Sequence, residues 1–237
     1  MKKEEINELI EPLNSENYLQ LRNVSQLKRL PWIGRNYINN EPKVLILGDT
    51  HYAINMDGSF SEEGYQEFMQ EESTINIVKC ALEEGPWSFF SGLHRLFHLT
   101  NDNDLKKFWS NVAFYNFVQE VMHSKDSIPS DDNFSEAWIC FCDVIDIINP
   151  DFCLFLGVRS ETAIASIIEC CGGNYFIQNG MEKCNGVFPR YGEIETKNGT
   201  KTRFIAIKHP SKYFSHEEWN KFLYHEEPIV MSLLDEE

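Results

Sequence analysis

The chain has 237 residues, 42% of them hydrophobic and 13% aromatic, which is enough for a buried core and excludes a disordered protein. No apolar run approaches the ~20 residues of a membrane-spanning helix, so we expect no membrane partner. The net charge of −16 disfavours nucleic-acid binding in general, but residues 181–221 are locally basic, with 8 basic against 5 acidic side chains.

Four short apolar runs bounded by turn residues predict strands that are buried on both faces. These runs are Lys43–Gly48, Asn111–Phe117, Phe152–Gly157 and Arg203–Lys208. Helical patterns separate them, at Thr74–Leu99, Asn133–Ile148 and Ser160–Cys170. Strands that alternate with helices pair in parallel through right-handed crossovers. A hairpin with Asn198-Gly199 at its turn is expected before the last strand.

The predicted fold is therefore α/β, a three-layer α/β/α sandwich with a four-stranded parallel sheet. No linker divides the chain, so we expect a single domain over residues 1–237. It would begin with a helical arm over about residues 1–40 and end in a short acidic tail. The seven cysteines lie mostly in apolar surroundings, which is typical of a reducing compartment and predicts a cytoplasmic protein.

Three polar residues follow or end predicted strands. Asp49 comes after the first strand, Asn116 ends the second, and His209 comes after the fourth. Each alone has an ordinary structural role, such as a helix cap, a loop partner or a buried histidine. Ligands of parallel sheets bind beyond the carboxyl ends of the strands, so the three together predict one site.

Five segments in this order resemble the uracil-DNA glycosylase superfamily over roughly residues 30–215. They are Gly48-Asp49-Thr50-His51-Tyr52, Phe90-Ser91-Gly92, Asn116, the stretch Asn149–Gly157 preceded by Pro129, and His209-Pro210-Ser211. The resemblance implies a uracil-DNA glycosylase-like fold. It also implies a monofunctional DNA glycosylase, which hydrolyses the N-glycosidic bond of a uracil or modified pyrimidine flipped out of DNA.

The resemblance also assigns roles to individual residues. Asp49 would handle the attacking water, and His209 would donate to the departing base. Asn116 would read the base edge, and Phe90 would stack on the base, with Phe89 as the alternative. Tyr52 and His51 would line the pocket, where His51 adds a titratable group. The residues expected to contact DNA are Lys208, Ser211, Lys212, the wedge residue Tyr213 and the neighbouring strand Lys201–Arg203.

Departures from the family pattern leave two alternatives open. His51 stands where the common forms carry proline, Thr50 also departs from the pattern, and a long insertion, Met56–Ser73, follows the first motif. These changes to the pocket wall favour an enzyme for a bulky hypermodified cytosine of phage DNA, with a defence role. The other alternative is a non-catalytic module that binds nucleic acid or a nucleotide.

No cofactor is expected, because no cysteine precedes Cys80 and the four-cysteine iron–sulfur branch needs two there. No metal is expected either, since His94 and His98 lack an evident third ligand. The expected partner is duplex or single-stranded DNA that carries the target base, bound by a monomer.

Overall fold

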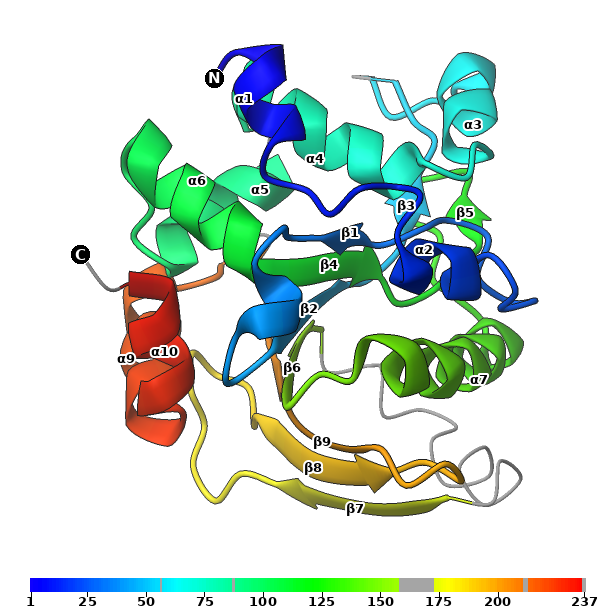
Figure 1. Cartoon of the computed structure of the whole chain (residues 1–237). Coiled ribbons are helices and arrows are strands. Elements are labelled where there is room, and N and C mark those ends of the chain that lie inside the picture. The colour runs from blue at the N-terminus through cyan, green and yellow to red at the C-terminus, as the bar shows by residue number, and fades with distance from the viewer. Residues whose placement is uncertain (56, 87, 158–172, 211–212, 236–237) are drawn as a thin grey trace.

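A computed structural model describes residues 1–55, 57–86, 88–157, 173–210 and 213–235, and its centre is a seven-stranded mixed sheet (Figure 1). In spatial order the strands are β1 (Trp32–Ile33), β4 (Val112–Asn116), β2 (Val44–Gly48), β6 (Phe152–Leu156), β9 (Lys201–Ile207), β8 (Arg190–Glu195) and β7 (Asn174–Asn179). A separate parallel pair joins β3 (His51–Tyr52) to β5 (Val121–Met122).

The four predicted strands form the middle of this sheet as β4, β2, β6 and β9, and all of them pair in parallel. The prediction of a four-stranded sheet is nevertheless wrong. At one edge β1 adds antiparallel to β4, and at the other β8 and β7 add antiparallel to β9. The predicted hairpin causes the second extension, because Gly199, with φ +85°, turns the chain back between β8 and β9.

The helices lie on both faces of the sheet. In Figure 1, α4 (Ser73–Glu83), α5 (Ser88–Leu96) and α6 (Asp102–Asn111) lie on one side of β4, and α7 (Asp131–Ile148) lies on the other. The remaining helices are α1 (Lys3–Asn7), α2 (Glu16–Leu21), the short 3-10 helix Tyr37–Asn39, α3 (Glu62–Phe68), α9 (His216–Glu226) and α10 (Pro228–Asp235). None of these described helices combines the length and hydrophobicity that crossing a membrane requires.

Two predicted elements differ from the observed ones. The helix expected over Thr74–Leu99 is broken into α4 and α5, because Gly85 takes a left-handed φ of +101° directly before Pro86. The acidic tail contains α10, whose Val230 is buried in the core. The helix expected over Ser160–Cys170 lies outside the described residues.

The predicted helix after Pro129 is confirmed as α7. It begins at the N-cap Ser130, whose Oγ accepts a hydrogen bond from the Asn133 backbone N–H, and ends at Asn149 in the left-handed region. Its buried Trp138 and Phe141 pack on Phe117 and on Phe155 of β6. This packing holds α7 against one face of the central strands.

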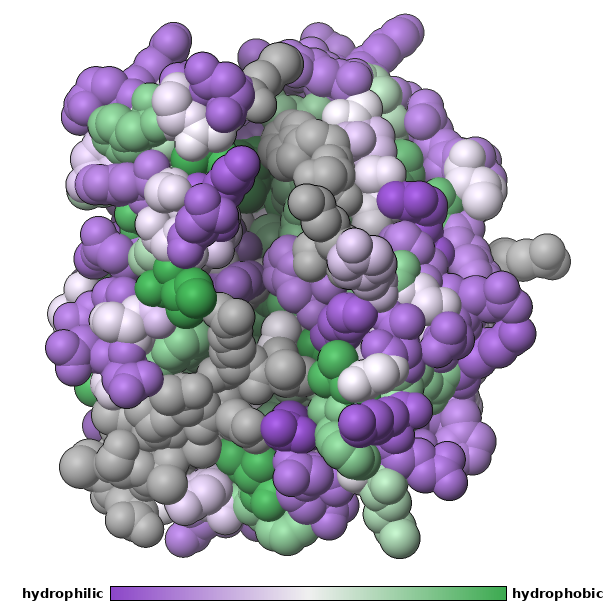
Figure 2. All heavy atoms as spheres, turned by 180° about the vertical axis from the view of Figure 1, so that it is seen from behind, coloured by the Kyte–Doolittle hydropathy of each residue, from purple (hydrophilic) through white to green (hydrophobic). Residues whose placement is uncertain are grey.

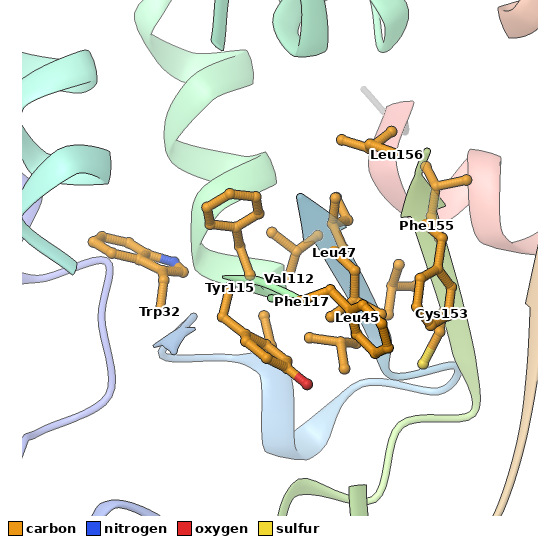
Figure 3. Close-up of a cluster of buried hydrophobic side chains, with 14 of the residues drawn as sticks. Trp32, Leu45, Leu47, Val112, Tyr115, Phe117, Cys153, Phe155 and Leu156 are labelled. Atoms are coloured by element: carbon orange, nitrogen blue, oxygen red, sulfur yellow. The ribbon is translucent and has the colours of Figure 1, made fainter. Parts of the chain in front are cut away.

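Large apolar side chains from four neighbouring strands fill the space around the central sheet (Figure 3). The labelled residues are Trp32, Leu45, Leu47, Val112, Tyr115, Phe117, Cys153, Phe155 and Leu156, all of them buried. Full burial of one such side chain stabilises the fold by about 1.5–3 kcal/mol. The core therefore fixes the register of the strands, and with it the positions of the residues at their carboxyl ends.

Candidate functional site

A cavity of about 340 Å³ lies at the carboxyl ends of β2 and β4. Its wall contains all six residues predicted to act in catalysis or base binding. The lining residues are Asp49, Thr50, His51, Tyr52, Ile54, Phe68, Ile77, Phe89, Phe90, Phe114, Asn116 and His209. The face of the molecule seen from behind in Figure 2 has a hollow near its middle, with hydrophobic side chains in its depth.

Asn116 is held at this cavity by the parallel pairing of β2 with β4, which places it opposite Gly48. Its backbone carbonyl accepts a hydrogen bond of 2.7 Å from Nε2 of Gln119. The side chain crosses the space that a Cβ on residue 48 would occupy. Within the described part of the chain, no hydrogen bond engages the Asn116 carboxamide, so its donor and acceptor groups are available to a ligand.

Asp49 and His209 bring a carboxyl group and an imidazole to the same cavity. Both residues are half-buried, and the Asp49 backbone carbonyl accepts a hydrogen bond of 2.9 Å from the Val118 N–H. Burial lowers the pKa of His209, and the negative charge of Asp49 opposes that shift without cancelling it. His209 is therefore a neutral imidazole at neutral pH.

His51 does not add a titratable group near neutral pH, and that expectation is wrong. Its side chain is 3% exposed, with Nε2 3.4 Å from Oγ1 of Thr74 and its ring 4.8 Å from the Phe68 ring. Burial and the charge of Arg29 lower the pKa of His51 to about 3. Phe68 of α3, which lies in the insertion, and Thr74 of α4 contact this histidine, which is an uncharged part of the wall.

The two aromatic candidates on α5 lie in different environments. Phe90 is 1% exposed and packs on Trp109 and Phe114, with ring centroids 5.8 Å away in both cases. Phe89 is half-buried, and its ring lies 5.7 Å from the His209 ring at an interplanar angle of 32°. Phe89, the alternative in the sequence, thus has the more accessible ring, and Phe90 supports it from the core.

His94 has the ordinary structural role of a buried histidine. Nε1 of Trp109 donates a hydrogen bond of 3.1 Å to Nε2 of His94, and burial lowers the pKa of His94 to about 4. The part of the chain that the structure describes contains no group of three or more histidine, cysteine or acidic side chains placed to hold a metal ion.

Tyr213 projects from the loop that begins at His209. It is 89% exposed and takes a left-handed φ of +62°, a strained conformation for a residue other than glycine. Nζ of Lys208 donates to the Tyr213 carbonyl at 2.7 Å and to Oδ1 of Asn185 at 3.3 Å, and Ser215 N–H donates to the same Asn185 oxygen at 3.0 Å. Lys208 thus holds this loop in place. Ser211 and Lys212 lie outside the described residues.

The basic strand residues Lys201 and Arg203 do not belong to this rim, contrary to expectation. They lie at the amino end of β9, where Lys201 pairs with Glu195 at 3.4 Å and Arg203 with Glu227 at 2.7 Å. A strand rises about 3.3 Å per residue, so Arg203 is separated from His209 by roughly 20 Å. The basic composition of residues 181–221 does not show at which end of a strand its charges lie, so the sequence could not place Lys201 and Arg203 far from the cavity.

Several lining residues were not anticipated from the sequence. Ile54 follows β3, Phe68 ends α3 within the insertion, and Ile77 lies on α4. Of these, only Ile77 has a sequence signal, because it lies one helical turn from Thr74 and so shares its face of the helix. The sequence marked Gly92 more clearly, because it belongs to the Phe90-Ser91-Gly92 motif. A Cβ there would lie 3.2 Å from Cβ of Pro210, so the glycine lets α5 approach the loop after His209.

The cavity thus combines a carboxyl group, a neutral imidazole, an unengaged carboxamide and an aromatic wall. This set can orient water, donate a hydrogen bond to a developing oxyanion and bind a flat heterocycle by its edge and face. No protein-family model matches the chain, and no curated protein shows significant sequence similarity to it.

Proposed function

We propose that the protein is a DNA base glycosylase that hydrolyses the N-glycosidic bond of a pyrimidine flipped out of DNA. The observation that carries this proposal is the convergence of Asp49, Asn116 and His209 on one cavity with an aromatic wall. The exposed Tyr213 on the loop after His209 supports it further.

The reaction requires the target nucleotide to leave the base stack, because its anomeric carbon is inaccessible inside a duplex. In the cavity, Phe89 stacks on the base and the Asn116 carboxamide bonds to its amide-like edge. Asp49 orients a water molecule and stabilises the cationic character of the sugar. The water oxygen bonds to the anomeric carbon as the bond to the base nitrogen breaks, and one water proton passes to Asp49.

The electron pair of the broken bond leaves with the base as an anion. A neutral His209 donates a hydrogen bond to the base oxygen next to that nitrogen, where the negative charge develops. Protonation of the released anion completes the reaction, and the products are a free base and an abasic sugar. No residue forms a covalent bond to the DNA in this scheme, so the enzyme is monofunctional.

DNA would bind on the rim that carries Tyr213. Tyr213 fills the gap left by the extruded base, and its aromatic ring is suited to a wedge between base steps. The exposed Arg95 on α5 supplies a cation beside His216 at the start of α9, since its charge contributes to lowering the pKa of His216. With a net charge of −16, the chain would hold DNA through few phosphate contacts.

The test is excision from duplexes that each carry one defined modified or mispaired base, followed by cleavage at abasic sites. Asp49→Asn and His209→Ala should each lower single-turnover excision at least 100-fold with unchanged melting temperatures. The controls are Asp126→Asn, an exposed acidic residue, and His225→Ala, whose side chain is 84% exposed.

Two outcomes separate the alternatives. Excision only from glucosylated or otherwise hypermodified cytosine would assign the phage-DNA activity. Tight binding of nucleic acid or a nucleotide without excision of any base, unaffected by Asp49→Asn, would show that the chain is a binding module.

A further inference from the structure

The lining of the cavity falls into two parts that are connected by different contacts. On the sheet side, the Phe89 ring lies 6.0 Å from the Phe114 ring and 5.7 Å from the His209 ring. The other part surrounds His51, which contacts Phe68 and Thr74. We call three apolar lining residues that lie outside the sheet, Ile54 after β3, Phe68 at the end of α3 and Ile77 one turn beyond Thr74 on α4, the apolar annex.

The polar atoms beside the annex are already bonded within the protein. Nε2 of His51 faces Oγ1 of Thr74, and Oγ1 of Thr50 donates a hydrogen bond of 2.5 Å to the Glu120 carbonyl. The Tyr52 hydroxyl lies 3.5 Å from the Ser127 carbonyl. A ligand group that enters the annex therefore meets hydrocarbon and an uncharged imidazole, and a polar group there would lose its hydrogen bonds to water.

Arg29 fixes this part of the cavity from behind. Its buried guanidinium donates to the carbonyls of Phe68 and Gln119, and Oε1 of Gln119 accepts a hydrogen bond of 3.0 Å from the Arg29 N–H. Gln119 in turn bonds to the Asn116 carbonyl. The end of α3 and the loop after β4 are thus tied together, so Phe68 of the annex is held in place in the same cavity wall as Asn116.

The cavity is larger than an unsubstituted pyrimidine requires. Its volume of about 340 Å³ equals that of roughly eleven waters at ~30 Å³ each, whereas uracil has only eight non-hydrogen atoms. If His209 donates to O2 and Asn116 reads N3 and O4, the ring atom opposite O2 is C5. A substituent on C5 would then extend away from His209, toward the remaining part of the cavity.

We propose that the target is a pyrimidine with a non-polar substituent on C5, held in the apolar annex by Ile54, Phe68 and Ile77. This inference rests on the proposed glycosylase function and names the base class that the function serves. A hydrophobic wall distinguishes one methylene by about 10- to 200-fold in rate, so the annex is sufficient to set a clear preference.

The experiment compares single-turnover excision of uracil, 5-ethyluracil and 5-hydroxymethyluracil, each opposite guanine in the same duplex. The wild type should remove 5-ethyluracil at least ten times faster than the other two bases. Ile77→Phe, which fills the annex, should lower the ratio of 5-ethyluracil to uracil rates at least ten-fold. The matched control is Ile128→Phe on the exposed surface, where the ratio should not change.

Any other result contradicts the inference, and the pattern of rates shows whether the proposed function fails as well. A wild type that removes uracil or 5-hydroxymethyluracil at least as fast as 5-ethyluracil overturns it but leaves the glycosylase function intact. An unchanged ratio in folded Ile77→Phe, checked by its melting temperature, also overturns it. Ile54→Phe provides a second filled annex in case Ile77→Phe does not fold. If no base is excised, the proposed function itself fails, and the inference fails with it.

Discussion

The Asn116 carboxamide occupies the space that any side chain on residue 48 would need, because a Cβ built on Gly48 would overlap Oδ1 of Asn116. The two residues are paired neighbours at the carboxyl ends of β2 and β4. Gly48 does not have a positive φ, so glycine is needed here for space and not for backbone conformation. The glycine before Asp49 therefore belongs to the site through the orientation it permits for Asn116.

Gly48→Ala should displace the Asn116 side chain and weaken base discrimination with it. We expect excision to fall at least ten-fold and the free energy of unfolding to fall by about 1–3 kcal/mol, the usual effect of overpacking. The double variant Gly48→Ala/Asn116→Ala removes the overlap, so it should regain most of the stability but not the activity. Denaturant unfolding measures the stability of each variant, and single-turnover assays measure its excision rate. Additive stability losses would contradict this steric relationship.

The activity should not require protonation of His209. Because burial lowers its pKa below that of an ordinary histidine, His209 is neutral at neutral pH and donates its hydrogen bond as a neutral imidazole. Single-turnover excision should therefore stay level from pH 7 to pH 9, and any decline should occur on the acid side. A rate that falls as pH rises through 6 to 7 would mean that a histidinium is the donor. The same profile measured on His225→Ala controls for effects of pH on DNA binding.

Substitution of Tyr213 tests whether its side chain acts as a wedge in duplex DNA or only packs against the protein. Tyr213→Ala should lower excision from duplex DNA at least ten-fold more than from single strands, because only the duplex has a gap to fill. Tyr213→Gly adds an independent measurement, since glycine accepts the φ of +62° without strain. This variant should match or exceed the wild type in stability, by up to about 1 kcal/mol, while losing duplex activity. Equal losses on both substrates would contradict the wedge role.

The central strands could be predicted because each is an uninterrupted apolar run between turn residues, as in Val44–Gly48 and Phe152–Leu156. Their parallel order followed from the helices between them, and the rule that ligands bind at the carboxyl ends then brought Asp49, Asn116 and His209 together. β7 could not be recognised in this way, because five of its six residues are exposed and no alternation marks a buried face. Its place in the sheet depends on pairing with β8 alone.

The protonation, exposure and position of individual side chains depend on tertiary contacts that the local sequence does not encode. His51 is neutral because Thr74, Phe68 and Arg29, which are distant in sequence, cover or oppose it. The ranking of Phe89 above Phe90 as the accessible ring depends on how α5 rotates against Trp109. A basic segment likewise predicts charge but not the end of the strand at which the charge lies.

The burial of neutral His51 should make the protein sensitive to acid in a measurable way. In the unfolded chain the histidine binds a proton below about pH 6.5, whereas in the folded protein it does so only near pH 3. Between these values the unfolded state holds the extra proton, so stability is lost as pH falls, by about 1.4 kcal/mol per pH unit. Buried His94, whose pKa is lowered to about 4, contributes in the same direction.

His51→Gln should remove this part of the pH dependence, because glutamine keeps a polar group for Thr74 and does not titrate. Carboxyl groups also titrate on acidification, but they do so in both proteins, so the difference between the two slopes isolates His51. Denaturant unfolding at intervals from pH 4.5 to pH 7.5 should give a shallower decline for His51→Gln than for the wild type, and the exposed control His225→Gln should follow the wild type. Arg29 opposes a charge on His51, so Arg29→Met should raise the pKa of His51 and weaken the acid sensitivity without abolishing it. Identical slopes for wild type and His51→Gln would mean that water reaches the imidazole in the folded protein, and that the wall beside the annex is polar.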